Sequence, residues 1–218
     1  GRNSLLIAGA ATLLCLTLAA LVGITAGYAG GKTDSVLSNL IDMIWAFPVY
    51  LLAISLSIVM IGKSYSFGPF EIGSDSLIVP ILIIGIVYVP YVARPVRGRV
   101  LALNQSEFIL AARGLGIRRG RILLRHILPN VATTLIVFAP MMMALNIVTE
   151  SSLSFLSVGV QPPNASWGTI LQDGQALLYS RPVVSMAPGL AIMVTVLLLN
   201  LLGDVLRDVL DPKSARGR

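Results

Sequence analysis

"LLIAGAATLLCLTLAALVGITA", residues 5 to 26, decides the fold class of this chain. The stretch contains no charged residue, and a helix of this length crosses the roughly 30 Å of hydrocarbon in a bilayer. It is too long for the apolar region of a secretory signal, and no basic, methionine-started segment precedes it. We therefore predict a membrane-spanning helix near the start of the chain.

The rest of the composition agrees with a membrane protein. Of the 218 residues, 56% are hydrophobic and 12% are charged, against about 25% charged in an average soluble domain. Four further apolar stretches are long enough to span a bilayer, at about 40–61, 77–93, 131–159 and 183–203. The sequence thus predicts an all-α, polytopic membrane helix bundle with five spans, forming a single domain over residues 1–218.

The segment "AGYAGGKTD", residues 26 to 34, ends like a phosphate-binding loop. The motif needs a glycine five positions before Gly31, where this chain has Ala26, and it must leave a strand rather than a membrane helix. We therefore expect no ATP site and no cofactor in this chain, and we interpret Gly27, Gly30 and Gly31 as a turn leaving the bilayer. Cys15 is the single cysteine, so no intrachain disulfide is possible.

The basic residues predict the orientation of the spans. With five spans, 13 of the 16 basic residues fall on one side, and the other side receives Arg2, Lys63 and Arg181. The first group consists of Lys32, Arg94, Arg97, Arg99, Arg113, Arg118, Arg119, Arg121, Arg125, Arg207, Lys213, Arg216 and Arg218. Because cytoplasmic loops carry the excess of lysine and arginine, we expect this side and the C-terminus to be cytoplasmic, in the cell (inner) membrane. The net charge of +6 then reflects topology rather than nucleic-acid binding.

The long connection at residues 103–130 has the pattern of a helix, a glycine turn and a second helix. Good helix formers fill 105–113, Gly114 and Gly116 interrupt them, and a second helical stretch from about 117 to 127 stops before Pro129. Arg118, Arg121 and Arg125 would share one face of this second helix. A DNA-binding helix-turn-helix is disfavoured because membrane spans adjoin both ends. A basic loop lying on anionic lipid does not explain the paired glycines.

Residues 107–129 resemble the "EAA" loop of the membrane subunits of binding-protein-dependent ABC importers. That loop has E-A-A, three residues, a glycine, a spacer, and a hydrophobic-Leu-Pro ending. The matching positions are Ala111, Ala112, Gly116, Leu128 and Pro129. Together with "FPVYLLAI", "LSFLSVGVQPPNASWG" and "PGLAIMVTVLLLNLLGDVLRDVLDP", the loop is similar to the dipeptide/oligopeptide/nickel branch, and most similar to its "C"-type permease.

The chain departs from the family pattern in two respects. The acid of E-A-A falls at Leu110, and Glu107, one helical turn earlier on the same face, is the candidate to replace it. These subunits typically have six helices, and this chain shows five. Since the sequence begins at Gly1 without a methionine, we expect a preceding segment with the remaining span.

The resemblance implies a type I importer permease fold, in which the two short helices couple to a separate cytoplasmic ATPase. The coupling residues it implies are Glu107, Ala111, Ala112, Gly114, Leu115, Gly116, Arg118 and Arg121. It further implies a homologous second permease (a heterodimer), two ATPases that bind ATP and Mg, and an external solute-binding protein. The expected solutes are dipeptides or oligopeptides, with nickel or another small solute as the alternative. A self-sufficient secondary transporter would need no helix pair at 103–130 and should show two similar halves.

Polar residues within the spans are the remaining candidates for function. Asn146 and Glu150 lie in the 131–159 stretch, with Glu150 about midway, and a carboxylate there must face the bundle or a wet cavity. We leave two interpretations open: translocation-pathway residues, or packed polar groups bonded to a neighbouring helix. Asp204 is predicted to pair with Arg207. No metal site and no catalytic residue is expected, because His126 has no nearby cysteine or second histidine.

Overall fold

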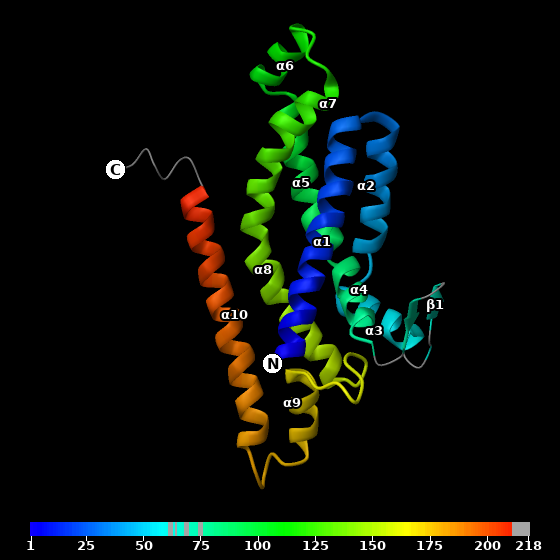
Figure 1. Ribbon diagram of the computed structural model, residues 1–218, viewed down its shortest axis with the longest axis vertical. Helices are drawn as coiled ribbons and strands as arrows, with labels where there is room; N and C mark the ends of the chain where they lie inside the picture. Colours follow the sequence, from blue (N-terminus) through cyan, green and yellow to red (C-terminus); the bar gives the residue numbers. More distant parts are fainter. Residues whose placement is uncertain (61–62, 64, 68–69, 74–75, 211–218) are drawn as a thin grey trace.

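The central element of the fold is its first helix. The structure is a computed structural model, described for residues 1–60, 63, 65–67, 70–73 and 76–210. Helix α1 (Arg2–Ala29) lies between α5, α8, α4 and α2. It confirms the span predicted at 5–26 and is long enough for a bilayer. As Figure 1 shows, the other helices gather around it along the long axis of the molecule.

Two of the predicted spans are broken rather than straight. The span predicted at 40–61 falls on α2 (Gly31–Trp45) and α3 (Val49–Met60), which meet at 85°, and residue 61 lies outside the described residues. The break falls at "AFP", where Pro48 disfavours helical geometry for Phe47. Residues 77–93 likewise divide between α4 (Ile78–Val87) and α5 (Val89–Asn104), bent by 43°. Among the described residues, three helices are long and apolar enough to span alone, and up to five spans result if each bent pair counts as one.

The C-terminal half contains the two other long helices. Helix α8 (Leu128–Phe155) packs on α1, and α10 (Val183–Leu210) packs on α8 and on the short helix α9 (Trp167–Gln175). Ser166 caps α9, because its side chain accepts the Thr169 N–H while the Thr169 side chain accepts the Ser166 N–H. Strands β1 (Tyr65–Phe67) and β2 (Phe70–Ile72) pair antiparallel between α3 and α4.

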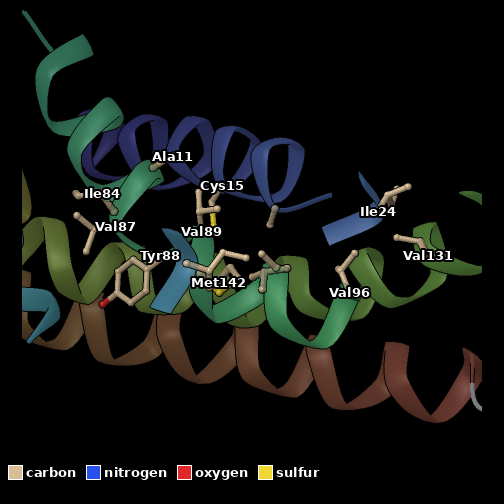
Figure 2. Close-up of a cluster of buried hydrophobic side chains, with 14 of the residues drawn as sticks. Ala11, Cys15, Ile24, Ile84, Val87, Tyr88, Val89, Val96, Val131 and Met142 are labelled. Atoms are coloured by element: carbon tan, nitrogen blue, oxygen red, sulfur yellow. The ribbon is translucent and has the colours of Figure 1, made fainter. Parts of the chain in front are cut away.

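The core is formed mainly by small and branched apolar side chains from α1, α4, α5 and α8, with single contributions from the other helices that pack on them. Figure 2 shows Ala11 and Cys15 of α1 close to Val89, with Met142 of α8 beside them. Two glycines of α1 bring helix backbones together: a Cβ on Gly23 would lie 2.7 Å from Val96 of α5, and one on Gly27 would lie 2.8 Å from Val100. Close approach through small residues is typical of membrane helix packing. The expectation that Gly27 belongs to a turn is therefore wrong, whereas Gly30 and Gly31 do form it, at φ of 65° and 55°.

The basic segments gather at one end of the molecule. The start of α2, which contains Lys32, the connection after α5 and the C-terminal end of α10 all lie in the upper part of Figure 1, with α10 standing apart from the others, and the N-terminus and α9 lie in the lower part. We call these the basic end and the opposite end. Lys213, Arg216 and Arg218, which were assigned to the same side, fall outside the described residues.

Candidate functional site

The connection between α5 and α8 projects beyond the long helices at the basic end (Figure 1). Its first helix, α6 (Glu107–Gly114), begins after Ser106, whose backbone is extended and whose hydroxyl donates to the Leu103 carbonyl at 2.5 Å. Glu107 occupies the first turn and Arg113 the last, an arrangement that complements the helix dipole. This helix begins and ends close to the predicted 105–113.

Helix α6 ends in a glycine turn of defined geometry. Gly116 has φ +75°, its N–H donates to the Arg113 carbonyl at 3.0 Å, and the Ile117 N–H donates to the Ala112 carbonyl at 3.1 Å. These two bonds form the Schellman ending of a helix, for which a left-handed glycine is the usual residue. The predicted turn is confirmed at Gly116. Gly114 is instead the last residue of α6, and a Cβ there would meet nothing within 4 Å.

The α6 segment separates an inward face from an outward one. Ile109 is fully buried and Ala112 is 7% exposed, and both belong to the apolar core. On the outward side Leu110 is 53% exposed and Leu115 is 82% exposed. Phe108 is 49% exposed and lies against the His126 ring, with 6.2 Å between the ring centroids. The buried side of α6 therefore packs on the apolar core, and its exposed side presents large apolar side chains to the outside.

The structure brings most of the predicted coupling residues to this outward surface. Glu107 and Leu110 are both exposed one helical turn apart, which keeps Glu107 available as the replacement acid. The other exposed members of the predicted set are Ala111, Gly114, Leu115, Gly116, Arg118 and Arg121. Ala112 differs, because it packs inward.

The second helix of the loop does not stop before Pro129. Helix α7 (Arg119–Ile122) continues through a π-helical turn, η1 (Leu123–Ile127), directly into α8. A proline ring inside an α-helix clashes with the carbonyl four residues earlier, and the wider π-turn relieves that conflict just before Pro129. Arg118, Arg121 and Arg125 lie before α7, within α7 and within η1, and all three are exposed. A shared arginine face stays a prediction.

Two long-range hydrogen bonds, which sequence reasoning missed, connect the loop and the end of α5 to the end of α1, and a third bond links α6 to the end of α5. The Tyr28 hydroxyl donates to the Arg119 carbonyl at 2.8 Å, and the Asn104 side chain donates to the Gly27 carbonyl at 2.8 Å. The Arg113 guanidinium donates to the Asn104 side-chain oxygen at 2.9 Å. Partners up to 91 residues apart give no local pattern in the sequence. A movement of α6 or α7 would therefore displace α1 as well as α8.

Comparison with known proteins identifies the family. The family model described as "Binding-protein-dependent transport system inner membrane component" matches residues 19–216. The chain belongs to this family. The resemblance based on the 107–129 loop and its flanking motifs is thereby confirmed.

Curated relatives of this inner membrane component lie in the branch that the motifs indicated. The glutathione transport system permease protein GsiD of Pectobacterium atrosepticum is 39% identical over 92% of this chain and 62% of the relative. The dipeptide transport system permease protein DppC of Alkalihalophilus pseudofirmus is 39% identical over 88% of this chain and 59% of the relative. The chain thus spans about three fifths of the length of these relatives.

A solved structure confirms the fold of the inner membrane component. A chain from an inward-facing crystal structure of the MetNI methionine ABC transporter superposes with a TM-score of 0.73. The match covers 96% of this chain and 94% of that chain at 18% identity. This likeness concerns the arrangement of the helices alone.

The two candidate pathway residues of the inner membrane component are buried within the subunit. Glu150 is fully buried and lies five residues before the end of α8, closer to the opposite end than the sequence suggested. The Ser154 hydroxyl donates to one carboxylate oxygen at 2.8 Å and itself accepts the Val160 N–H at 3.0 Å. The Asn146 side chain donates 2.9 Å to the Thr12 hydroxyl of α1, and its buried oxygen has no partner in the described part of the chain. Asn146 is thus bonded to a neighbouring helix, whereas the hydrogen bonds of Glu150 stay within α8. The pathway role of both residues stays a prediction.

Two ion pairs join the broken span α2–α3 to α5. The Arg97 guanidinium binds both carboxylate oxygens of Asp34, at 2.5 and 2.7 Å, with side-chain exposures of 33% and 18%. Arg94 binds Asp42 at 2.7 Å, with both side chains more exposed. The Arg94 guanidinium also lies 5.0 Å from the centre of the Trp45 ring. These two aspartates and two arginines therefore hold α2 and α5 together.

The positions of several other residues bear on the remaining sequence expectations. Lys32 belongs to α2, and helix α1 rather than a strand precedes it, so the context of a phosphate-binding loop is not met. No ion pair joins Asp204 and Arg207, both of which lie in the described part of α10, so that expectation is wrong. Within the described residues, no group of three or more potential metal ligands is found.

Proposed function

We propose that this chain is the membrane-spanning permease part of an ATP-driven importer, in which the 103–130 connection docks on a cytoplasmic ATPase subunit. The supporting observation is the outward surface of α6 and its turn. Large apolar side chains that project beyond the spans face neither core nor hydrocarbon, and such patches mark contacts with other proteins. Leu115, at 82% exposure, is the most exposed large apolar side chain of this surface.

The continuity of the helix after the loop supports a coupling role. From Arg119 to Phe155 the chain forms one unbroken helical run of 37 residues. A rigid-body movement of the docked loop is therefore passed along α8 into the membrane, and the Tyr28 and Asn104 hydrogen bonds pass it to α1. ATP and Mg belong to the partner subunits in this proposal, and the chain itself performs no catalysis.

The proposed solutes are peptides delivered by an external binding protein, moved through a pair formed with a homologous permease. The names of the two relatives, a glutathione and a dipeptide permease, support a peptide over nickel. The gathering of basic segments at one end supports the orientation with that end in the cytoplasm. Asn146 and Glu150 stay proposed pathway residues only for a state in which the packing around them opens.

The docking surface is tested with Leu115→Asp in the assembled transporter. Because interface centres contribute most of the binding energy, often 2 kcal/mol or more per large side chain, we expect the ATPases to be lost during affinity purification while the permease stays in the membrane. Tyr179→Asp, at a fully exposed position of the opposite end, is the matched control. Retention of the ATPases by Leu115→Asp would remove this surface from the interface.

A further inference from the structure

A cleft between three helices at the basic end is lined by basic and polar side chains that have no part in the proposed function. It encloses about 530 Å³ between α5, α8 and α10. In Figure 1 the end of α10 leans away from α8 at this level. The lining residues are Arg99, Asn130, Thr133, Thr134, Val137, Phe138, Arg207 and Leu210.

The cleft contains two cations without protein partners. Arg99 and Arg207 are both exposed, and neither makes an ion pair or hydrogen bond within the described ranges of the chain. Arg94 and Arg97 differ, because each binds an aspartate of α2. Neither Asp204 nor Asp208 of α10 lines the cleft. Its charge is therefore positive and available to an anion.

Hydroxyl and amide groups add donors and acceptors next to the arginines. The Asn130 NH₂ group donates to the His126 carbonyl at 2.7 Å, and the Thr133 hydroxyl donates to the Pro129 carbonyl at 3.3 Å. The Thr134 hydroxyl makes no hydrogen bond to any described residue. Two guanidinium groups and a hydroxyl together match the oxygens of a phosphate group.

The polarity of the cleft changes with depth along α8. Asn130, Thr133, Thr134 and Val137 follow one face of the helix at i, i+3, i+4 and i+7. The first turns of this face are polar, and Val137 and Phe138 are apolar about 10 Å further along the axis, at 1.5 Å per residue. A bilayer changes from headgroups to hydrocarbon over a similar distance. An occupant with an anionic head and an apolar tail fits this gradient better than a free anion does.

We propose that the cleft binds the phosphate of an anionic phospholipid, with its acyl chains along Val137 and Phe138. Basic pockets between membrane helices at the cytoplasmic surface are suited to such headgroups, and each surface arginine adds attraction. This site is separate from the coupling surface, since α6 and its turn contribute none of its residues.

The test uses the full-length subunit in its assembled transporter, reconstituted in phosphatidylcholine nanodiscs with a minor fraction of phosphatidylglycerol. Native mass spectrometry counts the phosphatidylglycerol that stays bound. We expect Arg99→Gln or Arg207→Gln to lower the relative occupancy about fivefold, and both together about thirtyfold. The Arg99→Lys, Arg207→Lys pair keeps the charge and should keep most of the lipid. Arg181→Gln removes the same charge from the opposite end and should change nothing.

Three results would overturn the proposal. Equal phosphatidylglycerol retention by the wild-type protein and the double glutamine variant would show that the arginines do not bind lipid, as when a partner permease fills the cleft. An equal loss of phosphatidylglycerol from the Arg181→Gln variant would show that lipid retention depends only on the net charge of the protein. Displacement of the lipid by equimolar inorganic phosphate would identify a small-anion site. If the double glutamine variant fails to assemble, Thr134→Val supplies the comparison, with reduced retention expected.

Discussion

Gly116 and Gly23 are both required for steric reasons, but the reasons act on different parts of the molecule. Gly116 is held at φ +75° by the hydrogen bonds that end α6, while a Cβ there would meet open space. Gly23 has ordinary helical geometry, but a Cβ would lie 2.8 Å from the Ala93 carbonyl oxygen. The first is needed for backbone conformation and the second for packing.

Gly116→Ala should reduce the efficiency of coupling. A left-handed conformation costs an alanine about 1 to 2 kcal/mol, so the turn would rearrange and displace Leu115 from its position. We expect more ATP hydrolysed per solute imported, measured in proteoliposomes that contain the complete transporter. Gly120→Ala is the control, because Gly120 is helical and has free space around it. An unchanged ratio in Gly116→Ala would show that the turn has no part in coupling.

Gly23→Ala should weaken the α1–α5 contact. Overpacking a tight site costs typically 1 to 3 kcal/mol, so the purified subunit should unfold at a lower temperature than the wild type in detergent. Gly9→Ala places the same methyl group on α1 where the nearest atom, on Met143, is 4.0 Å away. The control should keep the wild-type melting temperature. Equal melting temperatures for both variants would show that the α1–α5 contact accommodates a methyl group at Gly23 without loss of stability.

Among the elements, the two ion pairs between α2 and α5 should differ in strength. The Asp34–Arg97 pair is bidentate and partly buried, whereas the Asp42–Arg94 pair has one close contact and side-chain exposures of 60% and 43%. Exposed pairs contribute about 0 to 1 kcal/mol, and bidentate arginine–carboxylate pairs are stronger. Asp34→Asn should therefore lower the melting temperature more than Asp42→Asn does.

A charge reversal distinguishes pairing from a general charge effect. The combination Asp34→Arg with Arg97→Asp should recover part of the stability that either single reversal loses, because the attraction is restored. The double-mutant cycle is measured by thermal unfolding of the purified subunit. Additive losses would show that the two side chains do not interact in the membrane-embedded protein.

The observed elements, compared with the sequence, show which structural features a local sequence pattern can predict. Helix α1, the α6 helix and the Gly116 turn follow from an apolar run, helix formers and a glycine, which are local signals. The break at Phe47 lies one residue before a proline, and the break at Tyr88 lies two residues before one. The sequence therefore indicates where these spans bend, but it does not give the bend angle. The π-turn before Pro129 and the Tyr28–Arg119 bond depend on how distant segments meet. Local pattern therefore predicts elements better than the contacts between them.

At the scale of the whole molecule, the distribution of charge predicts a topology. The basic end contains the start of α2 with Lys32, the α6–α7 connection and the end of α10. Arg2 and Arg181 lie at the opposite end. Because positive segments are retained in the cytoplasm during insertion, the basic end should be inside. Gln105 and Tyr179 are exposed on the two ends and are suitable reporters, whereas Ser166 is fully buried and would not react.

We therefore expect opposite labelling of Gln105→Cys and Tyr179→Cys, each in a Cys15→Ala background. An impermeant maleimide added to intact spheroplasts should modify the Tyr179 variant and leave the Gln105 variant unmodified until the membrane is permeabilised. The Cys15→Ala parent should stay unlabelled, since the remaining chain has no thiol. Labelling of Gln105→Cys before permeabilisation would invert the topology. The α6 surface would then face away from ATP, and the proposed docking of an ATPase on Leu115 would have to be abandoned, whereas lipid binding between α5, α8 and α10 would move to the outer leaflet.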